Sequence, residues 1–409
     1  MITESKIGVK CLVGDGAHAS IQRTEFGIPY LSSKNFQKTG IDLSLLSFIS
    51  NEDYEKYFKD SSKALTKPRP NDLILSIIGS SIGDTYIFKE TDKFGISSSV
   101  AIIRPNDEIE AQFLYYYLKT NAVQYYIEAI KSGSAQGFIS LEMIRSIPLN
   151  FPKRDRQKII ASILSNYDEL IETNNQRIKL LEETAKEIYK EWFVRMRFPG
   201  YKGVKFVKGI PEGWEVKKLG DSFEILGGGT PSTVKDEYWD GNINWFTPTD
   251  ITGSKGMFLI ASSHKISEKG LKESSAKIFP AYSIMLTSRA TIGAIGINTC
   301  PGCTNQGFIT CLPNEILPYT FIYFWAYFNK EIFESLATGS TFLEITKGVF
   351  KKINILIPEE KVVSKFHSIV NPIFNQIENL QQQNDQLRQI RDRLLPRLIS
   401  GKLEVKDLA

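Results

Sequence analysis

Residues 153–192 read KRDRQKIIASILSNYDELIETNNQRIKLLEETAKEIYKEW, and this stretch decides the fold. It contains neither proline nor glycine, and a stripe of mostly apolar residues recurs at alternating steps of four and three. These residues are Ile160, Leu164, Tyr167, Ile171, Asn174, Ile178, Leu181, Ala185, Ile188 and Trp192. A stripe with this spacing is typical of a coiled-coil helix. We therefore predict one helix of about 45 residues, roughly 65 Å long at the usual rise per residue.

The same stripe returns near the C-terminus at a constant offset. Ser132-Gly-Ser134 followed by Pro152 recurs as Thr338-Gly-Ser340 followed by Pro358, an offset of 206 residues (340 − 134 and 358 − 152). Adding this offset to the first stripe gives a second stripe without adjustment. Its residues are Phe366, Val370, Ile373, Ile377, Leu380, Asn384, Leu387, Arg391, Leu394 and Leu398. The chain should therefore contain two long helices that are copies of each other.

The segments that precede the two helices also match in order. Ile28-Pro-Tyr-Leu31 corresponds to Ile243-Asn-Trp-Phe246, and the offset along the chain drifts only through small insertions. Both segments mix short β-branched runs with Gly, Pro and Asn. Each ends in one aromatic amphipathic helix, near 109–130 and near 316–336. This pattern predicts an α+β globule in each half of the chain.

We therefore expect an α+β protein of two homologous globules joined by two long helices. Residues 1–152 and 201–357 would form the globules, and residues 153–200 and 358–409 would form a helical spacer. An isolated stripe would expose its apolar side chains to water, so the two helices should pair as a coiled coil. Antiparallel pairing is the arrangement that relates the two halves by a pseudo-two-fold axis.

One antiparallel register pairs residues whose numbers sum to 558 and places Asn174 opposite Asn384 (174 + 384). Two facing asparagines can satisfy each other's hydrogen bonds, which fixes the register at some cost in stability. The alternative is that each amide binds water. Other pairs in this register are Ile178 with Leu380, Trp192 with Phe366 and, as a cation–π contact, Tyr167 with Arg391.

The composition is that of an ordinary water-soluble globular protein, with 42% hydrophobic and 23% charged residues. The net charge of +4 is too small to indicate a nucleic-acid partner by itself. No membrane segment is expected, because the longest apolar run, Phe321–Phe328, is too short to cross a bilayer and predicts a buried helix. The N-terminus has no signal-peptide core and the four cysteines form no disulfide pattern, so we expect a cytoplasmic protein.

The sequence contains no recognisable catalytic, metal-binding or cofactor-binding pattern. Gly227-Gly-Gly229 lacks the Lys-Ser/Thr of a phosphate-binding loop, and the three histidines lie far apart in the sequence. Cys300-Pro-Gly-Cys303 has the spacing of a zinc or redox pair, but no second pair follows and Pro-Gly favours a turn. We therefore expect no catalytic residue, no metal and no cofactor on this chain.

Both globules offer polar loops at matched positions. Their side chains suit base edges, and their glycine amides suit phosphates. The loops differ in chemistry while the frame around them repeats; ordinary solvated turns are the simpler alternative. The candidate DNA-binding residues are Gly16, His18, Tyr30, Ser33, Lys34, Asn35, Ser80 and Ser98 in the first half, and Gly228, Thr230, Ser232, Trp245, Thr247, Thr249, Asp250, Ser288, Arg289, Asn305 and Gln306 in the second.

Several longer motifs are distributed along the second half. It opens with Ile210-Pro-Glu-Gly-Trp214, continues with Gly228-Gly-Thr-Pro-Ser232 and Tyr238-Trp-Asp-Gly241, and closes on Arg391-Asp-Arg-Leu-Leu-Pro396. These motifs resemble those of the specificity subunits of type I restriction-modification systems, and the resemblance covers essentially the whole chain. The first half lacks the Pro-Glu-Gly-Trp lead-in and starts almost directly at its globule.

This resemblance implies two α/β target recognition domains, each recognising one half of a split, asymmetric sequence in double-stranded DNA. It also implies two methyltransferase (modification) subunits docked along the helices, with restriction subunits in the full complex. S-adenosylmethionine, ATP and magnesium would then be bound by those partners, and this chain would be a non-catalytic specificity subunit.

Two other functions are compatible with the sequence. One is a stand-alone DNA-binding regulator or architectural protein that uses the coiled coil as a ruler, and the other is the separated specificity half of a methyltransferase–nuclease fusion. A regulator should be stable alone, whereas a specificity subunit should need modification subunits to cover its helices. The apolar residues that flank the stripe, which are more than one partner helix can bury, are Ile159, Ile163, Leu170, Leu180 and Phe193.

Overall fold

The computed structural model describes residues 2–38, 40–62, 65–133, 137–254, 256–339 and 343–405. Ser134 and Ser340, two residues of the repeat, lie outside these ranges. The chain divides into unit 1, which comprises Met1–Ile171 with Gln386–Ala409, and unit 2, which comprises Glu172–Asp385. Each unit therefore combines one globule with a segment of both long helices.

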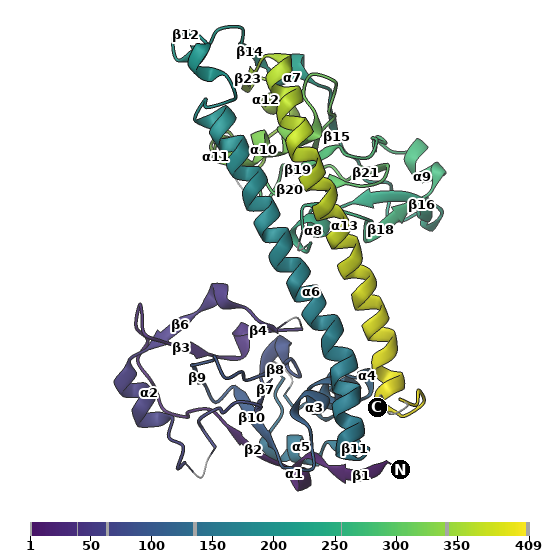
Figure 1. Cartoon of the computed structure of the whole chain (residues 1–409). Helices are drawn as coiled ribbons and strands as arrows, with labels where there is room; N and C mark the ends of the chain where they lie inside the picture. The colour runs from purple at the N-terminus through teal and green to yellow at the C-terminus, as the bar shows by residue number, and fades with distance from the viewer. Residues whose placement is uncertain are drawn as a thin grey trace. The chain divides into compact units, whose positions relative to one another are not determined.

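Unit 1 contains a short two-stranded ladder and two sheets, drawn in purple and blue in Figure 1. The ladder pairs β1 (Thr3–Lys6) with β11 (Pro148–Phe151), antiparallel, and α1 (Ile7–Lys10) follows β1. The larger sheet is antiparallel, in the order β2 (Cys11–Asp15), β10 (Val100–Pro105), β7 (Leu73–Ser76) and β8 (Thr85–Ile87). The smaller sheet places β3 (Ile28–Leu31) between antiparallel β6 (Ser47–Ile49) and parallel β9 (Gly95–Ile96).

Unit 2 repeats this arrangement in teal and green. Its ladder pairs β14 (Glu215–Lys218) with β23 (Asn354–Ile357), antiparallel, and α7 (Leu219–Ser222) follows β14. The larger sheet has the order β15 (Ile225–Gly227), β22 (Phe308–Cys311), β19 (Ile284–Thr287), β20 (Ile295–Asn298) and β17 (Phe258–Leu259), of which β17 joins in parallel. The smaller sheet places β16 (Trp239–Phe246) between antiparallel β18 (His264–Ile266) and parallel β21 (Gly302–Thr304).

The two units share the order of the four antiparallel strands of the larger sheet, to which unit 2 adds β17, and the internal repeat predicted from the sequence is confirmed. The middle strand of each smaller sheet has one antiparallel and one parallel neighbour: Tyr30 pairs with Gly95 in unit 1, and Trp245 pairs with Cys303 in unit 2. The ladder of unit 1 forms as in unit 2, although its sequence lacks the Pro-Glu-Gly-Trp lead-in. The frame is therefore duplicated even where sequence identity is lost.

The prediction of one aromatic helix in each globule is wrong, because two helices take its place. Unit 1 has α3 (Ala111–Leu118) and α4 (Asn121–Ile130), and unit 2 has α10 (Tyr319–Phe328) and α11 (Lys330–Ser335). In unit 1 the break falls at Thr120, whose side chain caps α4 by accepting a hydrogen bond from the Val123 N–H. Helix α10 buries most of the apolar run Phe321–Phe328, as predicted.

Short elements complete both units. In unit 1 they are the antiparallel pair β4 (Phe36–Gln37) and β5 (Gly40–Ile41), with α2 (Asn51–Tyr57) and α5 (Leu141–Ser146). In unit 2 they are the antiparallel pair β12 (Phe206–Val207) and β13 (Ile210–Pro211), with α8 (Pro248–Thr252), α9 (Glu268–Lys272) and α12 (Lys347–Phe350).

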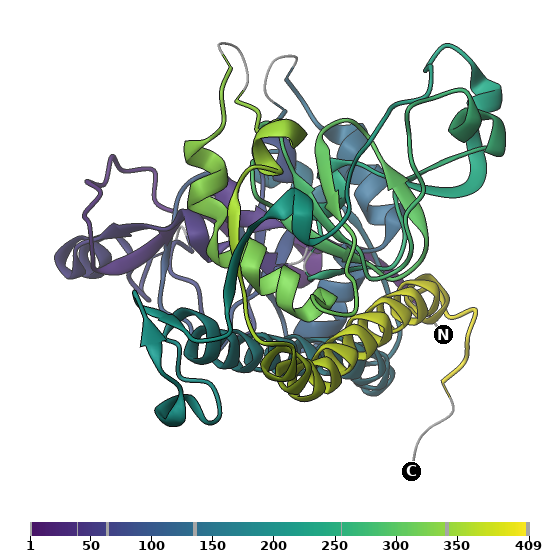
Figure 2. The same ribbon diagram turned by 90° about the horizontal axis from the view of Figure 1, so that it is seen from above.

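The two long helices are α6 (Arg154–Tyr189), extended by a π-helical turn over Lys190–Val194, and α13 (Glu360–Ile399). In unit 2 they run antiparallel, and both views show them side by side there (Figure 1 and Figure 2). Asn174 Nδ2 donates to Asn384 Oδ1 at 3.0 Å, and the rings of Trp192 and Phe366 lie 6.0 Å apart. Both pairs have the register in which paired numbers sum to 558, and the asparagines bind each other.

In unit 1 the first turns of α6 pack with the last turns of α13. Their shared core includes Ile160, Leu164 and Leu398. The cation–π contact expected between Tyr167 and Arg391 is replaced by an ion pair, because the Arg391 guanidinium binds the carboxylate of the neighbouring Asp168. Asp168 also accepts a hydrogen bond from Tyr116 Oη at 2.6 Å, which ties α3 to the helix pair. The predicted partner of Arg391 is therefore wrong by one residue.

The core of unit 2 closes around the end of α6. The Tyr189 ring lies 5.0 Å from that of Phe193 and 5.7 Å from that of Phe366 on α13, and α10 adds further rings on the same side. Phe193 is therefore a core residue, which corrects its assignment to the exposed flank of the stripe. Leu170 and Leu180, by contrast, are 48% and 63% exposed. The long helices are thus buried on one face and carry apolar side chains on another.

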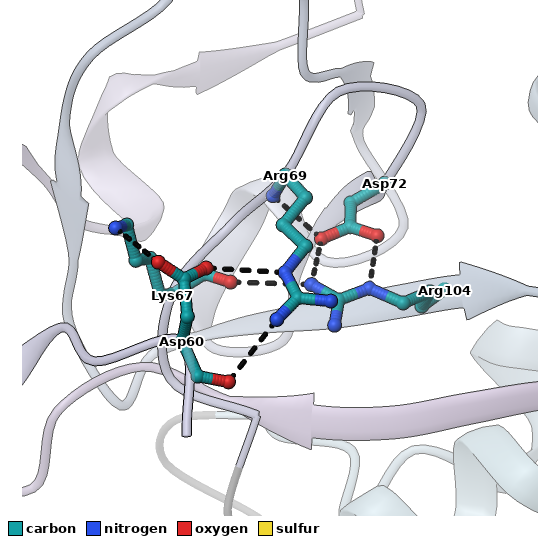
Figure 3. A network of polar contacts seen from close by, with 5 residues as sticks. All are labelled: Asp60, Lys67, Arg69, Asp72 and Arg104. Atoms are coloured by element: carbon teal, nitrogen blue, oxygen red, sulfur yellow. Dashed lines mark hydrogen bonds and ion pairs between the residues drawn. The ribbon is translucent and has the colours of Figure 1, made fainter. Parts of the chain in front are cut away.

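A buried ion pair fixes the larger sheet of unit 1 (Figure 3). Asp72, which directly precedes β7, is 1% exposed, and its carboxylate accepts from Arg104 Nε at 2.7 Å and from Nη2 at 2.6 Å. The Arg69 N–H also donates to it at 2.8 Å. Nearby, Asp60 forms exposed ion pairs with Lys67 and Arg69. The two acids differ mainly in burial, so they offer a matched comparison.

Replacing Asp72 should cost far more stability than replacing Asp60. Asp72→Leu leaves the mostly buried guanidinium of Arg104 without its carboxylate, which should cost up to about 3–5 kcal/mol. Asp60→Leu breaks exposed pairs that are worth about 0–1 kcal/mol. Denaturant-induced unfolding of the two variants measures the difference, and equal losses would contradict the structural role of the buried pair.

The asparagine pair gives a second test. Asn384→Leu should leave the buried amide of Asn174 without its acceptor and cost about 1–3 kcal/mol. The double variant Asn174→Leu/Asn384→Leu should recover most of that loss, because neither amide then remains unsatisfied. Denaturant unfolding monitored by tryptophan fluorescence compares the two. A double variant that is less stable than the single one would show that these residues do not face each other.

Candidate nucleic-acid interface

Four polar loops of unit 2 meet where its two sheets adjoin. The loop after β15 contacts the loop after β21, since Gly229 N donates to Thr304 O at 2.9 Å. The loop after β21 is held to β16 by a bond from Asn305 N to Phe246 O at 3.1 Å. The loop after β19 joins them through Ser288 N, which donates to Gly307 O at 2.8 Å. The second-half candidates from four separate loops are therefore brought together.

A capped turn follows β16 at the centre of this cluster. Thr247 N donates to Asp250 Oδ2 at 2.7 Å, and Ser263 N donates to Asp250 Oδ1 at 2.8 Å. Burial alone would raise the pKa of Asp250, but the hydrogen bonds from Ser263 and Thr247 hold that pKa below its ordinary value. Asp250 is therefore ionised at neutral pH, and its oxygens are occupied by the turn. Ser263 was not among the sequence candidates, and no local pattern marks it.

The unit 2 candidates divide by exposure. The exposed ones are Thr230, Ser232, Thr249 and Gln306, and the partly exposed ones are Gly228, Thr247, Asp250, Arg289 and Asn305. The Thr230 hydroxyl donates to Gln306 Oε1, which links the tips of two loops. Arg289 Nε lies 2.9 Å from Glu344 Oε1, so its charge is partly neutralised within the unit. The cluster thus presents mainly hydroxyl and amide groups.

Two second-half candidates are core residues, which corrects their assignment to the DNA-facing surface. Trp245 is 6% exposed, and its indole Nε1 donates to Gly229 O at 2.9 Å while the Trp239 ring packs edge-on at 5.0 Å. Ser288 is 2% exposed. Its N–H donates to Gly307 O, and its carbonyl oxygen accepts from Ile345 N. Because both side chains are buried, neither can reach a base edge. Both residues instead stabilise the loops through hydrogen bonds to loop backbone atoms.

Unit 1 forms the equivalent cluster. Ala17 N donates to Ile96 O at 3.0 Å, which joins the loop after β2 to the end of β9. Ser33 N donates to Ser99 Oγ at 2.9 Å, and Ser81 Oγ donates to Ser33 O at 2.7 Å. Ser81 and Ser99 are neighbours of the candidates Ser80 and Ser98. They fix the loops, while Ser80 is exposed and Ser98 is partly exposed.

The first-half candidates also divide. Lys34 is exposed, Ser33 is partly exposed, and exposed His18 lies with Nε2 2.7 Å from Asp15 Oδ2. Tyr30 is 3% exposed, with the Arg23 guanidinium 3.8 Å from its ring centroid, so it is a core residue. Asn35, also 3% exposed, accepts from Ser32 N at 2.9 Å. The assignment of Tyr30 and Asn35 to a DNA-facing surface is corrected, because their side chains are enclosed.

One glycine in each unit lets two loop backbones approach closely. Gly16 is buried in unit 1, and a Cβ built there would lie 2.2 Å from the carbonyl oxygen of Ile96. In unit 2 a Cβ on Gly228 would lie 1.9 Å from the carbonyl oxygen of Asn305. These two candidates occupy equivalent places. Gly16 follows β2 and meets the end of β9, and Gly228 follows β15 and meets the loop after β21. Only glycine fits either place.

The described residues include no group of three or more His, Cys, Asp or Glu side chains that could hold a metal ion. Cys300 lies in the connection between β20 and β21 and Cys303 lies in β21, and neither forms a disulfide. Burial raises the pKa of Cys303 to about 12, which disfavours the thiolate that a metal or redox site needs. The turn interpretation of this motif therefore fits the structure. In the described part of the chain, no helix has the length and hydrophobicity to span a membrane.

A repeated frame that carries two unlike clusters of polar loops defines a class of protein, namely a chain with two related recognition modules. The family model of the type I restriction modification DNA specificity domain matches residues 22–183 and 211–389. The chain belongs to this family, and its role is DNA sequence recognition within a restriction-modification complex rather than catalysis. Specificity subunits bind DNA and act with modification and restriction subunits.

Curated relatives agree with the family. The type I restriction enzyme MjaIX specificity subunit of Methanocaldococcus jannaschii is 31% identical over 317 residues, which cover 75% of this chain and 72% of the relative. The HindI specificity subunit of Haemophilus influenzae is 25% identical over 78% of this chain and 83% of its own length. The solved S subunit of a type I restriction-modification system from M. genitalium has a TM-score of 0.61 and 17% identity, covering 97% of this chain and 96% of its own. That structural likeness concerns the fold alone.

Gly228→Ala should distort the loop cluster of unit 2, because the new methyl group meets a backbone oxygen that cannot move without shifting a loop. We expect a stability loss of about 1–3 kcal/mol and weaker DNA binding by the assembled complex. Gly16→Ala should have the same effect in unit 1. The control is Gly203→Ala, since a Cβ on Gly203 has no atom within 4 Å. Thermal unfolding and a gel-shift titration test this, and a Gly228 variant that matches the control would contradict it.

Proposed function

We propose that this chain recognises a bipartite, asymmetric DNA target, with each loop cluster recognising one half. The observation that carries the proposal is the pair of equivalent clusters built on one frame but with unlike exposed residues. The first presents Lys34 and several serines, and the second presents Thr249, Thr230 and Gln306. Because different side chains favour different base edges, two such clusters would select two different half-sites.

Two methyltransferase subunits and, in the full complex, restriction subunits would assemble with the chain. Exposed apolar side chains on the long helices support a docking surface for the methyltransferase subunits, since such groups gain stability when they are covered. They are Leu170 and Leu180 on α6, and Ile369 and Ile390 on α13. This arrangement favours a specificity subunit over a stand-alone regulator, which would have no need of uncovered helices.

S-adenosylmethionine, ATP and magnesium would be bound by those partner subunits, and the complex would act on chromosomal or foreign DNA in the cytoplasm. The chain's own contribution is then to bind a chosen duplex and hold it for the methyltransferase. Extrusion of the target base from the duplex would be the work of the methyltransferase subunits.

Exchanging one globule should change one half of the target only. We predict that replacing residues 1–152 by the corresponding segment of another specificity subunit changes one half-site and leaves the other half intact. The reciprocal exchange of residues 201–357 should alter the opposite half. Each chain is co-expressed with its modification subunits in a methylation-free host, and methylated bases are mapped by long-read sequencing. A single exchange that changes both halves would contradict the assignment of one half to each globule.

A further inference from the structure

Each unit places the same four-residue turn directly after the middle strand of its smaller sheet. In unit 1 the turn is Ser32–Asn35, where Ser32 N donates to Asn35 Oδ1 at 2.9 Å and Asn35 N donates to Ser32 O at 3.0 Å. In unit 2 it is Thr247–Asp250, where Thr247 N donates to Asp250 Oδ2 at 2.7 Å and Asp250 N donates to Thr247 O at 2.9 Å. The first and fourth residues of each turn therefore hold each other reciprocally.

The fourth residue is also fixed from outside the turn. Asn35 Nδ2 donates to Asp42 O at 3.4 Å, and Asp42 N donates to Asn35 O at 2.7 Å. Asp250 Oδ1 accepts from Ser263 N at 2.8 Å and from the Ser263 hydroxyl, while Oδ2 also accepts from Thr247 Oγ1 at 2.8 Å. These bonds engage both Asp250 oxygens. Asn35 and Asp250 are therefore positioning residues, although their chemistry alone suggests contacts with adenine or cytosine.

The third residue of each turn is the one that faces solvent. Lys34 is exposed and makes no ion pair with any described residue. Thr249 is exposed, and its hydroxyl lies 2.7 Å from Thr247 Oγ1, which sets the orientation of its side chain. The second residue is less available: Ser33 is partly exposed with its N–H bound to Ser99 Oγ, and Pro248 is partly exposed. Each turn thus presents one side chain on a rigid base.

We propose that this capped turn is a specificity-determining element of each recognition domain, with Lys34 and Thr249 contacting bases while Asn35 and Asp250 position them. The inference rests on the proposed function and names the contacts of the same site. The Lys34 ammonium would donate to the O6 and N7 acceptors of a guanine in the major groove. Thr249 would place its methyl group against a thymine methyl, with its hydroxyl held by Thr247. A turn fixed at both ends loses little conformational freedom when it binds DNA.

The base contacts are tested in the assembled methyltransferase, with methylated bases mapped on a plasmid library in which each position of the target is randomised. Lys34→Ala should relax selectivity about tenfold or more at one or two neighbouring positions of one half-site, and leave the other half-site unchanged. Lys38→Ala, which removes another exposed lysine four residues later in the chain, is the matched control and should preserve the motif. Thr249→Ser, which deletes only the methyl group, should relax one position in the opposite half-site.

The positioning role is tested by a pair of substitutions at Asp250. Asp250→Asn keeps an acceptor for the Thr247 N–H but turns an amide nitrogen, which is a donor, toward the Ser263 N–H, so it should broaden selectivity less than Asp250→Ala does. Asp250→Ala removes both caps and should broaden selectivity at the position that Thr249 contacts. Equal motifs for the alanine and wild-type proteins would overturn the positioning role. A broader motif in the asparagine variant than in the alanine variant would overturn it too, because the asparagine retains one of the two caps.

Different experimental outcomes would contradict the role of the turn and the proposed function. If Lys34→Ala lowers methylation uniformly over all sequences and flattens the salt dependence of binding, Lys34 contacts a phosphate and the inference is overturned. If exchange of whole globules changes one half-site but the turn variants do not, the inference fails while the proposed function stands. If exchange of one globule changes both half-sites, the proposed function itself fails.

Discussion

The structure depends on the pairing of α6 with α13, because neither globule completes its core without both helices. In unit 2 the ring of Phe366, which comes from α13, packs against Tyr189 and Phe193 of the α6 end. In unit 1 Leu398 of α13 joins the core that contains Leu164 of α6. Loss of the pairing would uncover large apolar side chains in each unit, at a cost of about 1.5–3 kcal/mol for each side chain exposed. The bond between Asn174 and Asn384 stabilises little by itself, but it penalises any shifted register.

The second constraint is the duplicated frame. Its strands and close-approach glycines are the same in both units, whereas the exposed loop residues differ. Equivalent strands carry equivalent glycines, so Gly16 and Gly228 allow the same close approach of two loop backbones. Between these fixed points the loops use different tethers: serine hydroxyls in unit 1, and the Asp250 carboxylate in unit 2. Because the frame is held by backbone pairing and core packing, exposed loop residues can differ without loss of the fold. A constant frame with variable loop residues suits a protein whose fold must be kept while the DNA sequence that it recognises changes.

The sequence predicts the long helices and the repeat well because both follow from spacing, and it predicts the helix register from the two asparagines of the stripes. A stripe with a period near 3.5 residues, whose spacing recurs 206 residues later, leaves little freedom in how two helices can pair. Individual side chains are predicted less well. Arg391 binds Asp168 rather than Tyr167, since a small rotation of the helix exchanges neighbours. Thr120 interrupts a helix that its apolar pattern would continue, because a local cap competes with the longer helix.

The structure brings the candidate loops of each unit together as groups, but it does not expose every candidate residue. Tyr30, Trp245 and Ser288 have the chemistry of DNA contacts, yet packing from distant segments encloses them. Asn35 and Asp250 are engaged by their own turns, and Ser263 enters the cluster from another strand connection without any local signal. Whether a polar side chain supports a loop or is presented by it depends on partners far away in the sequence. The sequence therefore predicts which loops lie together but does not divide their residues into buried and exposed ones.

In the proposed function, two recognition domains are joined by paired helices that set the gap between two half-sites. This role of the helices can be measured by inserting one heptad into each helix, between Ile171 and Glu172 in α6 and between Gln386 and Leu387 in α13. These sites are paired in the 558 register, so the seam is kept while each helix grows by about 10 Å. Methylated-base mapping should then return the same two half-sites with a gap longer by about three base pairs. An unchanged gap, or altered half-sites, would show that the paired helices do not set the gap.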